Sequence, residues 1–124
     1  MPDQLDLEES SNAISAGNVF TIDIQSEHLT EVFTGVGERG VRAEQIAARV
    51  VHEAQKYREA GAPVGEHLAD QLLIPMALAR GGSYTTTTPT LHTTTNIEIV
   101  KKFLPVEINT TQLTEDVWKV EVLG

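Results

Sequence analysis

The stretch Pro89-Thr90-Leu91-His92-Thr93-Thr94-Thr95-Asn96-Ile97-Glu98 decides the fold of the C-terminal half, because it connects a predicted strand to a predicted helix. Thr95 and Glu98 have the Ser/Thr-x-x-Glu spacing of a capping box, which predicts a helix over Thr95–Leu104. The threonine-rich segment Ser83–Thr88 is predicted to be a strand, because β-branched residues favour an extended backbone.

His92 lies directly before this predicted helix, which makes it a candidate reactive residue. The first N–H groups of a helix lack partners and carry partial positive charge, so they favour an anion nearby. A neutral imidazole in that place could attack a phosphate, because the incoming negative charge is already compensated. The alternative is that His92 is one of four histidines and a polar loop residue without chemistry.

Pro75 interrupts a second predicted helix, Val64–Ala79. Proline has no N–H, so the carbonyl of Gln71 loses its helical partner and a bend is expected beside Asp70 and Gln71. The freed carbonyl and the opened turn could contact an adenine or a ribose. The alternative is a kinked core helix with water on that carbonyl.

The remaining elements follow from hydrophobic periodicity and turn residues. Alternating or β-rich segments predict strands, a stripe of apolar residues at three- to four-residue spacing predicts a helix, and Gly81-Gly82 predicts a tight turn. The predicted strands are Asn18–Gln25, Leu29–Gly37, Val106–Gln112 and Val117–Leu123, and the predicted helix is Arg42–Ala60. The order ββα and then αβαββ predicts an α+β fold, with helices on one face of each sheet in two layers.

Composition limits the function classes. A chain of 124 residues forms one domain or two very small ones. It contains no cysteine, which excludes disulfides, zinc-thiolate sites and thiol catalysis. Its net charge of −9, with only nine Lys and Arg residues, argues against this chain alone gripping RNA.

The sequence shows no sign of a signal peptide, a membrane span, a serine hydrolase motif or a zinc site. The longest apolar run, Leu72–Ala79, is far shorter than the about 20 residues of a membrane span, and Met1–Gly17 is acidic without an apolar core. A cytoplasmic protein without a membrane partner is therefore expected. No G-x-S-x-G is present, and His28, His52, His67 and His92 lack the paired spacing of zinc ligands, so no metal site is predicted.

Several segments, in order, resemble the C-terminal part of the RNA 3′-terminal phosphate cyclases. The likeness covers roughly residues 17–124, and the ordered set is more specific than any single piece. The resembling segments are Thr34–Glu44, Gly65-Glu66-His67-Leu68-Ala69-Asp70-Gln71-Leu72-Leu73-Ile74-Pro75-Met76-Ala77, Gly81-Gly82-Ser83-Tyr84-Thr85, Pro89-Thr90-Leu91-His92, Thr95-Asn96-Ile97 and Phe103-Leu104-Pro105-Val106. The chain departs mildly at Arg80, where small residues are common, and at Thr90, where serine is frequent.

The resemblance implies an enzyme that transfers a nucleotide. In the family, a histidine in this position attacks the α-phosphate of ATP and becomes adenylylated. The AMP then activates an RNA 3′-phosphate, and the neighbouring 2′-hydroxyl closes a 2′,3′-cyclic phosphate. Carried over, His92 is the nucleophile, and the segment His67, Leu68, Ala69, Asp70 and Gln71 contacts the nucleotide. ATP and Mg²⁺ are the implied cofactors and an RNA 3′-phosphate end the implied partner, with Asp70 or a backbone carbonyl orienting the imidazole.

The resemblance also implies a domain organisation. The family enzymes are much longer, so we expect this chain to be a C-terminal portion that is inactive alone. Residues 1–17 are then disordered or a linker, 18–60 part of a small inserted α+β domain, and 61–124 the last βαβαββ-type repeat of the catalytic domain. RNA binding would depend mainly on the N-terminal part. The alternative function is that of a non-catalytic RNA-processing or ribosome-assembly relative with the same fold, and such relatives lack the histidine.

Overall fold

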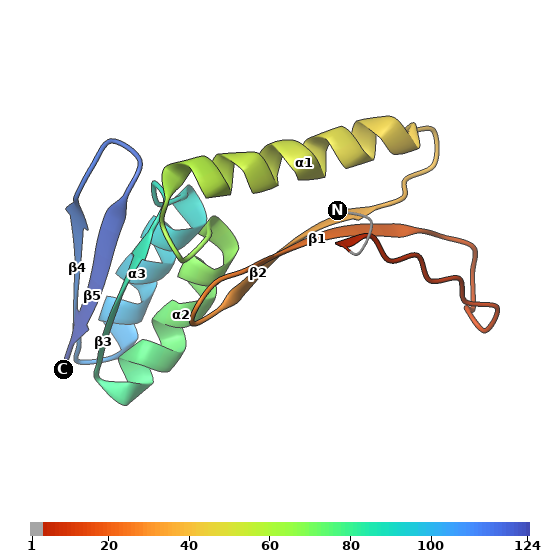
Figure 1. The fold of residues 1–124 in the computed structure, drawn as a ribbon. Helices are drawn as coiled ribbons and strands as arrows, with labels where there is room; N and C mark the ends of the chain where they lie inside the picture. The colour runs from red at the N-terminus through yellow and green to blue at the C-terminus, as the bar shows by residue number, and fades with distance from the viewer. Residues whose placement is uncertain (1–3) are drawn as a thin grey trace.

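A computed structural model describes residues 4–124, which form three helices and five strands (Figure 1). Three helices and two antiparallel sheets make this an α+β fold, as the sequence predicted. In chain order the elements are β1 (Val19–Gln25), β2 (Thr30–Val36), α1 (Ala43–Ala60), α2 (Glu66–Ala79), β3 (Gly81–Thr86), α3 (Leu91–Phe103), β4 (Glu107–Gln112) and β5 (Trp118–Leu123).

The first part of the fold is an antiparallel hairpin, β1–β2, with α1 packed along it (Figure 1). The predicted apolar stripe of α1 is confirmed, since Ile46, Val50 and Tyr57 are buried. A Cβ on Gly35 would lie 2.6 Å from Cγ2 of Ile46, so glycine lets the strand approach the helix closely. The rings of Phe33 and Tyr57 add a tilted contact with centroids 5.5 Å apart.

The second part is a three-stranded antiparallel sheet with the strand order β3-β5-β4. Helices α2 and α3 lie side by side on one face of this sheet (Figure 1), which confirms the predicted two-layer packing. Its core joins both helices to the sheet, with Leu73 of α2 and Val120 of β5 fully buried. The other buried members of this core are Val64, Ala69, Ala77, Tyr84, Ile97, Val100, Ile108 and Val122.

A buried carboxylate connects the two parts. Glu31 of β2 is only 8% exposed, and its Oε1 accepts a hydrogen bond of 2.6 Å from the backbone N–H of Gly65, the N-cap of α2. The free N–H groups at a helix start favour a negative charge, which explains why a carboxylate is tolerated there. The hydroxyl of Tyr57 donates to the carbonyl of Pro63 at 2.7 Å, so two contacts fix where α2 begins.

The N-terminal segment before β1 adds no regular element. The predicted linker spans residues 1–17, and its first three residues lie outside the described part of the chain. Residues 4–17 are exposed along their whole length and belong to none of the strands or α-helices. The division into domains at residues 17 and 60 stays a prediction.

The start of α3 differs from the prediction. The helix begins at Leu91, four residues before the predicted start at Thr95, and ends at Phe103. Thr90 is the N-cap, and its hydroxyl oxygen accepts a hydrogen bond of 3.4 Å from the N–H of Thr93. Thr93 is fully buried, so tertiary packing extends the helix through threonines whose intrinsic helix propensity is low. His92 therefore lies inside the first turn of α3 rather than before it.

The connection from α2 to β3 also differs from the prediction. Strand β3 covers Gly81–Thr86 instead of Ser83–Thr88, so Gly81 and Gly82 belong to the strand and pair with β5. The chain instead turns at Arg80, which caps α2 in the left-handed conformation with φ 55° and ψ 38°. The pair Gly81-Gly82 predicted a tight turn, but the residue at which the chain turns is Arg80, directly before it.

Removing the carboxylate that joins the two parts should destabilise the fold. We expect Glu31→Ala to lower the free energy of unfolding by about 2 kcal/mol, because the buried N–H of Gly65 loses a charged acceptor. Urea unfolding followed by circular dichroism measures the change. Glu27→Ala is the matched control, because the Glu27 side chain is 87% exposed. Equal stability of the two variants would contradict a structural role for Glu31.

Replacing Arg80 by glycine should stabilise the fold. Glycine enters the left-handed region without the steric cost that a Cβ imposes, so Arg80→Gly should raise the free energy of unfolding by about 1 kcal/mol. Ala79→Gly, one residue earlier and still helical, should lower it by about 1 kcal/mol. Urea unfolding compares both with the unsubstituted chain, and a change of the same sign in both variants would refute the assignment.

Candidate active site between α2 and α3

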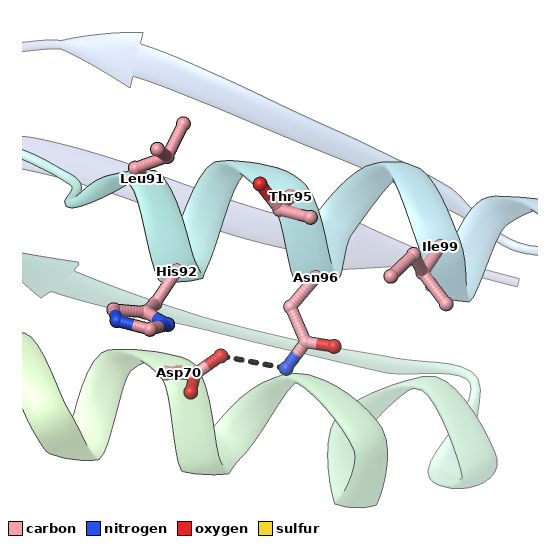
Figure 2. A pocket seen from close by; sticks show the side chains of 6 residues that line it. All are labelled: Asp70, Leu91, His92, Thr95, Asn96 and Ile99. Carbon is pink, nitrogen blue, oxygen red and sulfur yellow. Dashed lines mark hydrogen bonds between the residues drawn. The ribbon is translucent and has the colours of Figure 1, made fainter.

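A cleft of about 440 Å³ opens between the neighbouring helices α2 and α3. All of its lining residues except one come from α3, and they recur every three or four positions along a single face (Figure 2). The lining residues are Asp70 of α2 and Leu91, His92, Thr95, Asn96 and Ile99 of α3. The cleft therefore combines an imidazole, a carboxylate and an amide with an apolar rim.

His92 lies at the end of the cleft where α3 begins. Its side chain is exposed, and Figure 2 shows the imidazole pointing from α3 toward α2, into the cleft that Asp70 also lines. His92 lies two residues after the N-cap Thr90, within the first turn, where backbone N–H groups favour an anion. An accessible imidazole beside both a carboxylate and a helix start can act on a phosphate, because one group orients the ring and the other compensates the incoming charge.

Asp70 is held in place by a hydrogen bond across the cleft. Nδ2 of Asn96 donates to Oδ1 of Asp70 at 2.6 Å, and both residues are partly buried (Figure 2). A hydrogen bond to a carboxylate is among the stronger ones in proteins. The carboxylate that shares the cleft with His92 is thus held by a residue from the same helix as His92.

Tyr84 supports the turn of α2 that carries Asp70. This tyrosine of β3 is buried, and its hydroxyl donates to the backbone carbonyl of Ala69 at 2.6 Å. Burial of the phenol, together with the negative charge of Asp70, raises the pKa of Tyr84 to about 12. The sheet beneath the cleft is therefore connected directly to the backbone next to Asp70.

Only one residue of the predicted nucleotide-contacting segment shares the cleft with His92. Asp70 lies in it, whereas the exposed side chain of Gln71 does not line it. Ala69 is 1% exposed in the core, and Leu68 packs against that core. A five-residue helical segment exceeds one turn, so its side chains cannot all face one cleft. The helix continues through Pro75 to Ala79.

His67 borders a different cleft. This second cleft, of about 480 Å³, lies between the first part of the fold and the start of α2, with Glu31, His52, Tyr57 and Asp116 among its lining residues. The His67 side chain is 86% exposed, and its Nε2 lies 3.5 Å from Oε1 of Glu66. His67 and His92 are therefore not brought together in this chain.

The sequence did not predict that Thr95, Asn96 and Ile99 line a cleft with His92, since Thr95 was predicted only as a helix cap. They follow His92 at intervals of three, four and seven residues, which is the spacing of one helical face. That signal becomes visible only when the helix is started at Leu91, because the predicted start at Thr95 left His92 in a loop. The error in one helix boundary thus concealed most of the cleft.

The described residues offer no metal site and no membrane-spanning helix. Within residues 4–124, no group of three or more His, Asp or Glu side chains is arranged to hold a metal ion. In that same part of the chain, every helix is too short or too polar to cross a membrane.

Comparisons with known proteins identify the family. The family model described as RNA 3′-terminal phosphate cyclase matches residues 9–110, which is most of the chain. An RNA 3′-terminal phosphate cyclase of Ralstonia nicotianae is 51% identical over 114 residues, covering 92% of this chain and 33% of that protein. Proteins of the same name from Ectopseudomonas mendocina and Pseudomonas fluorescens are 45% and 48% identical, covering 88% and 85% of the chain.

These matches confirm the family that the ordered resembling segments predicted. The structure defines an α+β protein with an accessible histidine in a cleft. The chain belongs to the RNA 3′-terminal phosphate cyclase family. It spans about a third of the length of the curated relatives it matches, since it covers 31% to 33% of the three named here.

Tyr84 should make stability depend on alkaline pH. Its pKa is raised from 10.0 to about 12, so between these values the unfolded chain loses a proton that the folded chain retains. Stability therefore falls as pH rises through this window and is unaffected below it. Tyr84→Phe should show a shallower fall, measured as urea midpoints from neutral to alkaline pH. Parallel curves for the two proteins throughout the window would show that Tyr84 is not the linked group.

Proposed function

We propose that the protein carrying this chain converts an RNA 3′-phosphate into a 2′,3′-cyclic phosphate with ATP, through a covalent histidine–AMP intermediate on His92. The observation that carries the proposal is the accessible imidazole of His92 in the first turn of α3, beside Asp70, in a member of the cyclase family. His92 is also the histidine that matches the nucleophile of the family.

The proposed reaction has three steps. An unprotonated ring nitrogen of His92 attacks the α-phosphorus of ATP, a P–N bond forms, and pyrophosphate leaves. The RNA 3′-phosphate then attacks the same phosphorus, which breaks the P–N bond and gives an RNA 3′-phosphate activated by AMP. Finally the 2′-hydroxyl attacks the 3′-phosphorus, loses its proton and releases AMP.

Asp70 is the group proposed to orient the imidazole. A carboxylate oxygen in the cleft can accept a hydrogen bond from the ring nitrogen that carries the proton, which leaves the other nitrogen unprotonated for attack. A backbone carbonyl was the alternative orienting group. The position of Asp70 beside the ring favours the carboxylate (Figure 2).

Nucleotide binding is proposed for the segment His67, Leu68, Ala69, Asp70 and Gln71, in which Asp70 is the member closest to the reaction. In the described residues no carboxylate cluster is suited to a metal ion, so we propose that Mg²⁺ arrives on the phosphates of ATP. The residues proposed here act on the nucleotide and not on the metal.

The RNA is proposed to bind mainly outside this chain. The chain has only nine Lys and Arg residues and a net charge of −9, whereas RNA phosphates are bound chiefly by basic side chains. The chain covers about a third of its relatives, so the rest of such a protein supplies the further contacts. ATP and RNA ends occur together in the cytoplasm, where we place the protein.

A non-catalytic relative with the same fold, acting in RNA processing or ribosome assembly, is the alternative. It would retain the helices and sheets but would need no reactive imidazole. The presence of His92 in an open cleft with Asp70 favours the enzyme.

Covalent labelling tests the proposal. We expect a chimera, in which this chain replaces the matching 114 residues of the Ralstonia nicotianae relative, to acquire acid-labile label from ATP labelled at the α-phosphate. His92→Ala should reduce the label by at least about a hundredfold, because the covalent nucleophile is lost. Label is measured after denaturing electrophoresis.

Two controls complete this experiment. His52→Ala removes another exposed histidine, on α1, and should leave labelling unchanged. Equal labelling of the chimera and its His92→Ala variant would remove His92 from the mechanism. The 124-residue chain alone should show little or no turnover, and robust cyclisation by it would contradict the need for the rest of the protein.

A further inference from the structure

Asn96 lines the cleft but takes no part in the three proposed reaction steps. It lies four residues after His92 on the same face of α3, and both side chains reach toward α2 (Figure 2). Within residues 4–124, its hydrogen bond to Asp70 is the one side-chain to side-chain hydrogen bond that joins two helices. A single amide thus connects the candidate nucleophile's helix to the carboxylate beside the nucleophile.

The chemistry of the contact fixes the orientation of both groups. A carboxylate can only accept hydrogen bonds, so the Nδ2 end of the Asn96 amide must face Asp70. Oδ1 of Asp70 is then occupied, and Oδ2 retains lone pairs for a second donor. The imidazole of His92 is the neighbouring side chain in the cleft that can supply that donor (Figure 2).

We infer that Asn96 is a positioning residue for the reaction, holding Asp70 in the orientation that fixes the proton on one ring nitrogen of His92. This inference rests on the proposed function of His92. Without the amide, the half-buried carboxylate of Asp70 could rotate toward solvent, and the imidazole would lose its orienting acceptor.

A purely structural role for Asn96 makes a different prediction. The packing of α2 against α3 does not depend on this amide, because Leu73, Ile97 and Val100 are buried between the helices and the sheet. Tyr84 independently holds the backbone of α2 at Ala69. Loss of Asn96 should therefore leave the fold intact and change the protonation pattern of the His92 ring.

The test reads the tautomer of His92 directly. Long-range ¹H–¹⁵N correlation spectra of the full 124-residue chain at pH about 8.5, where imidazoles are mostly neutral, distinguish which nitrogen carries the proton. His52 is exposed on α1 and serves as the internal reference. We expect the tautomer ratio of His92 to be about three- to tenfold more one-sided than that of His52, as a charge-assisted hydrogen bond at an open site would produce.

Variants then assign the effect. Asn96→Ala and Asp70→Ala should each bring the His92 ratio to that of His52, and the double variant should change it no further, because both act through one contact. Ile99→Ala removes another lining side chain of the cleft and should leave the ratio unchanged. Asn96→Ser, which keeps a polar group too short to reach Asp70, provides a second variant and should match Asn96→Ala.

Two results would overturn the inference. The first is a His92 ratio equal to that of His52 in the unsubstituted chain. The second is a one-sided ratio that persists in both Asn96 variants but is lost in Asp70→Ala.

Labelling of the chimera separates this inference from the function on which it rests. We expect Asn96→Ala to slow adenylylation about tenfold or more, because a misplaced orienting group lowers the fraction of reactive rings. Labelling at the full rate in Asn96→Ala, with none in His92→Ala, would overturn the role of Asn96 and leave the function standing. Label retained in His92→Ala would instead overturn the proposed function.

Discussion

The site depends on the packing of α2 and α3 against one face of the β3-β5-β4 sheet. Neither helix carries the candidate site alone, since His92 and Asn96 belong to α3 and Asp70 to α2. The buried core that includes Leu73 and Val120 sets the distance and rotation of the two helices. Because close-packed interiors do not deform continuously, this core holds the polar groups in register across an open cleft.

The supports of α2 come from three directions, which explains how a polar site can sit on a helix containing proline. Glu31 holds its first turn through Gly65, Tyr84 holds the carbonyl of Ala69, and Asn96 holds the side chain of Asp70. Each contact is made by a different element of the fold. Pro75 removes the helical hydrogen bond that would reach the carbonyl of Gln71, next to Asp70, so these contacts support α2 where its own hydrogen bonding is interrupted.

The sequence predicted elements well where one physical signal dominated. The apolar stripe of α1, which includes Ile46, Val50 and Tyr57, is long and periodic. The structure confirms this helix, and its first residue lies within one residue of the predicted start. The start of α3 was wrong, because the Thr95–Glu98 capping pattern outweighed the cap at Thr90, and burial of Thr93 cannot be read from local propensity. Either Asp70 or a backbone carbonyl was predicted to be the acceptor for the imidazole, and the sequence did not choose between them. The position of Asn96 beside Asp70 could not be predicted, because it depends on a contact between residues that are 26 positions apart in the sequence.

The physical magnitudes indicate how the work of the site is divided. The start of an exposed helix stabilises an anion by only about 0.3–1 kcal/mol, whereas enzymes lower barriers by about 8–23 kcal/mol. The N-terminus of α3 can therefore bias where a phosphate rests but cannot supply the catalysis.

A carboxylate–imidazole pair contributes an oriented and unprotonated nitrogen, and its negative charge also favours the positive ring that forms when that nitrogen bonds to phosphorus. The triphosphate itself needs cations that this acidic chain does not gather in the cleft, where the lining residues include neither Lys nor Arg. In the proposed reaction a nucleophile and its orienting groups belong to one short chain, and charge compensation for the leaving pyrophosphate would come from Mg²⁺ and from groups outside this chain, which covers 33% of its Ralstonia nicotianae relative.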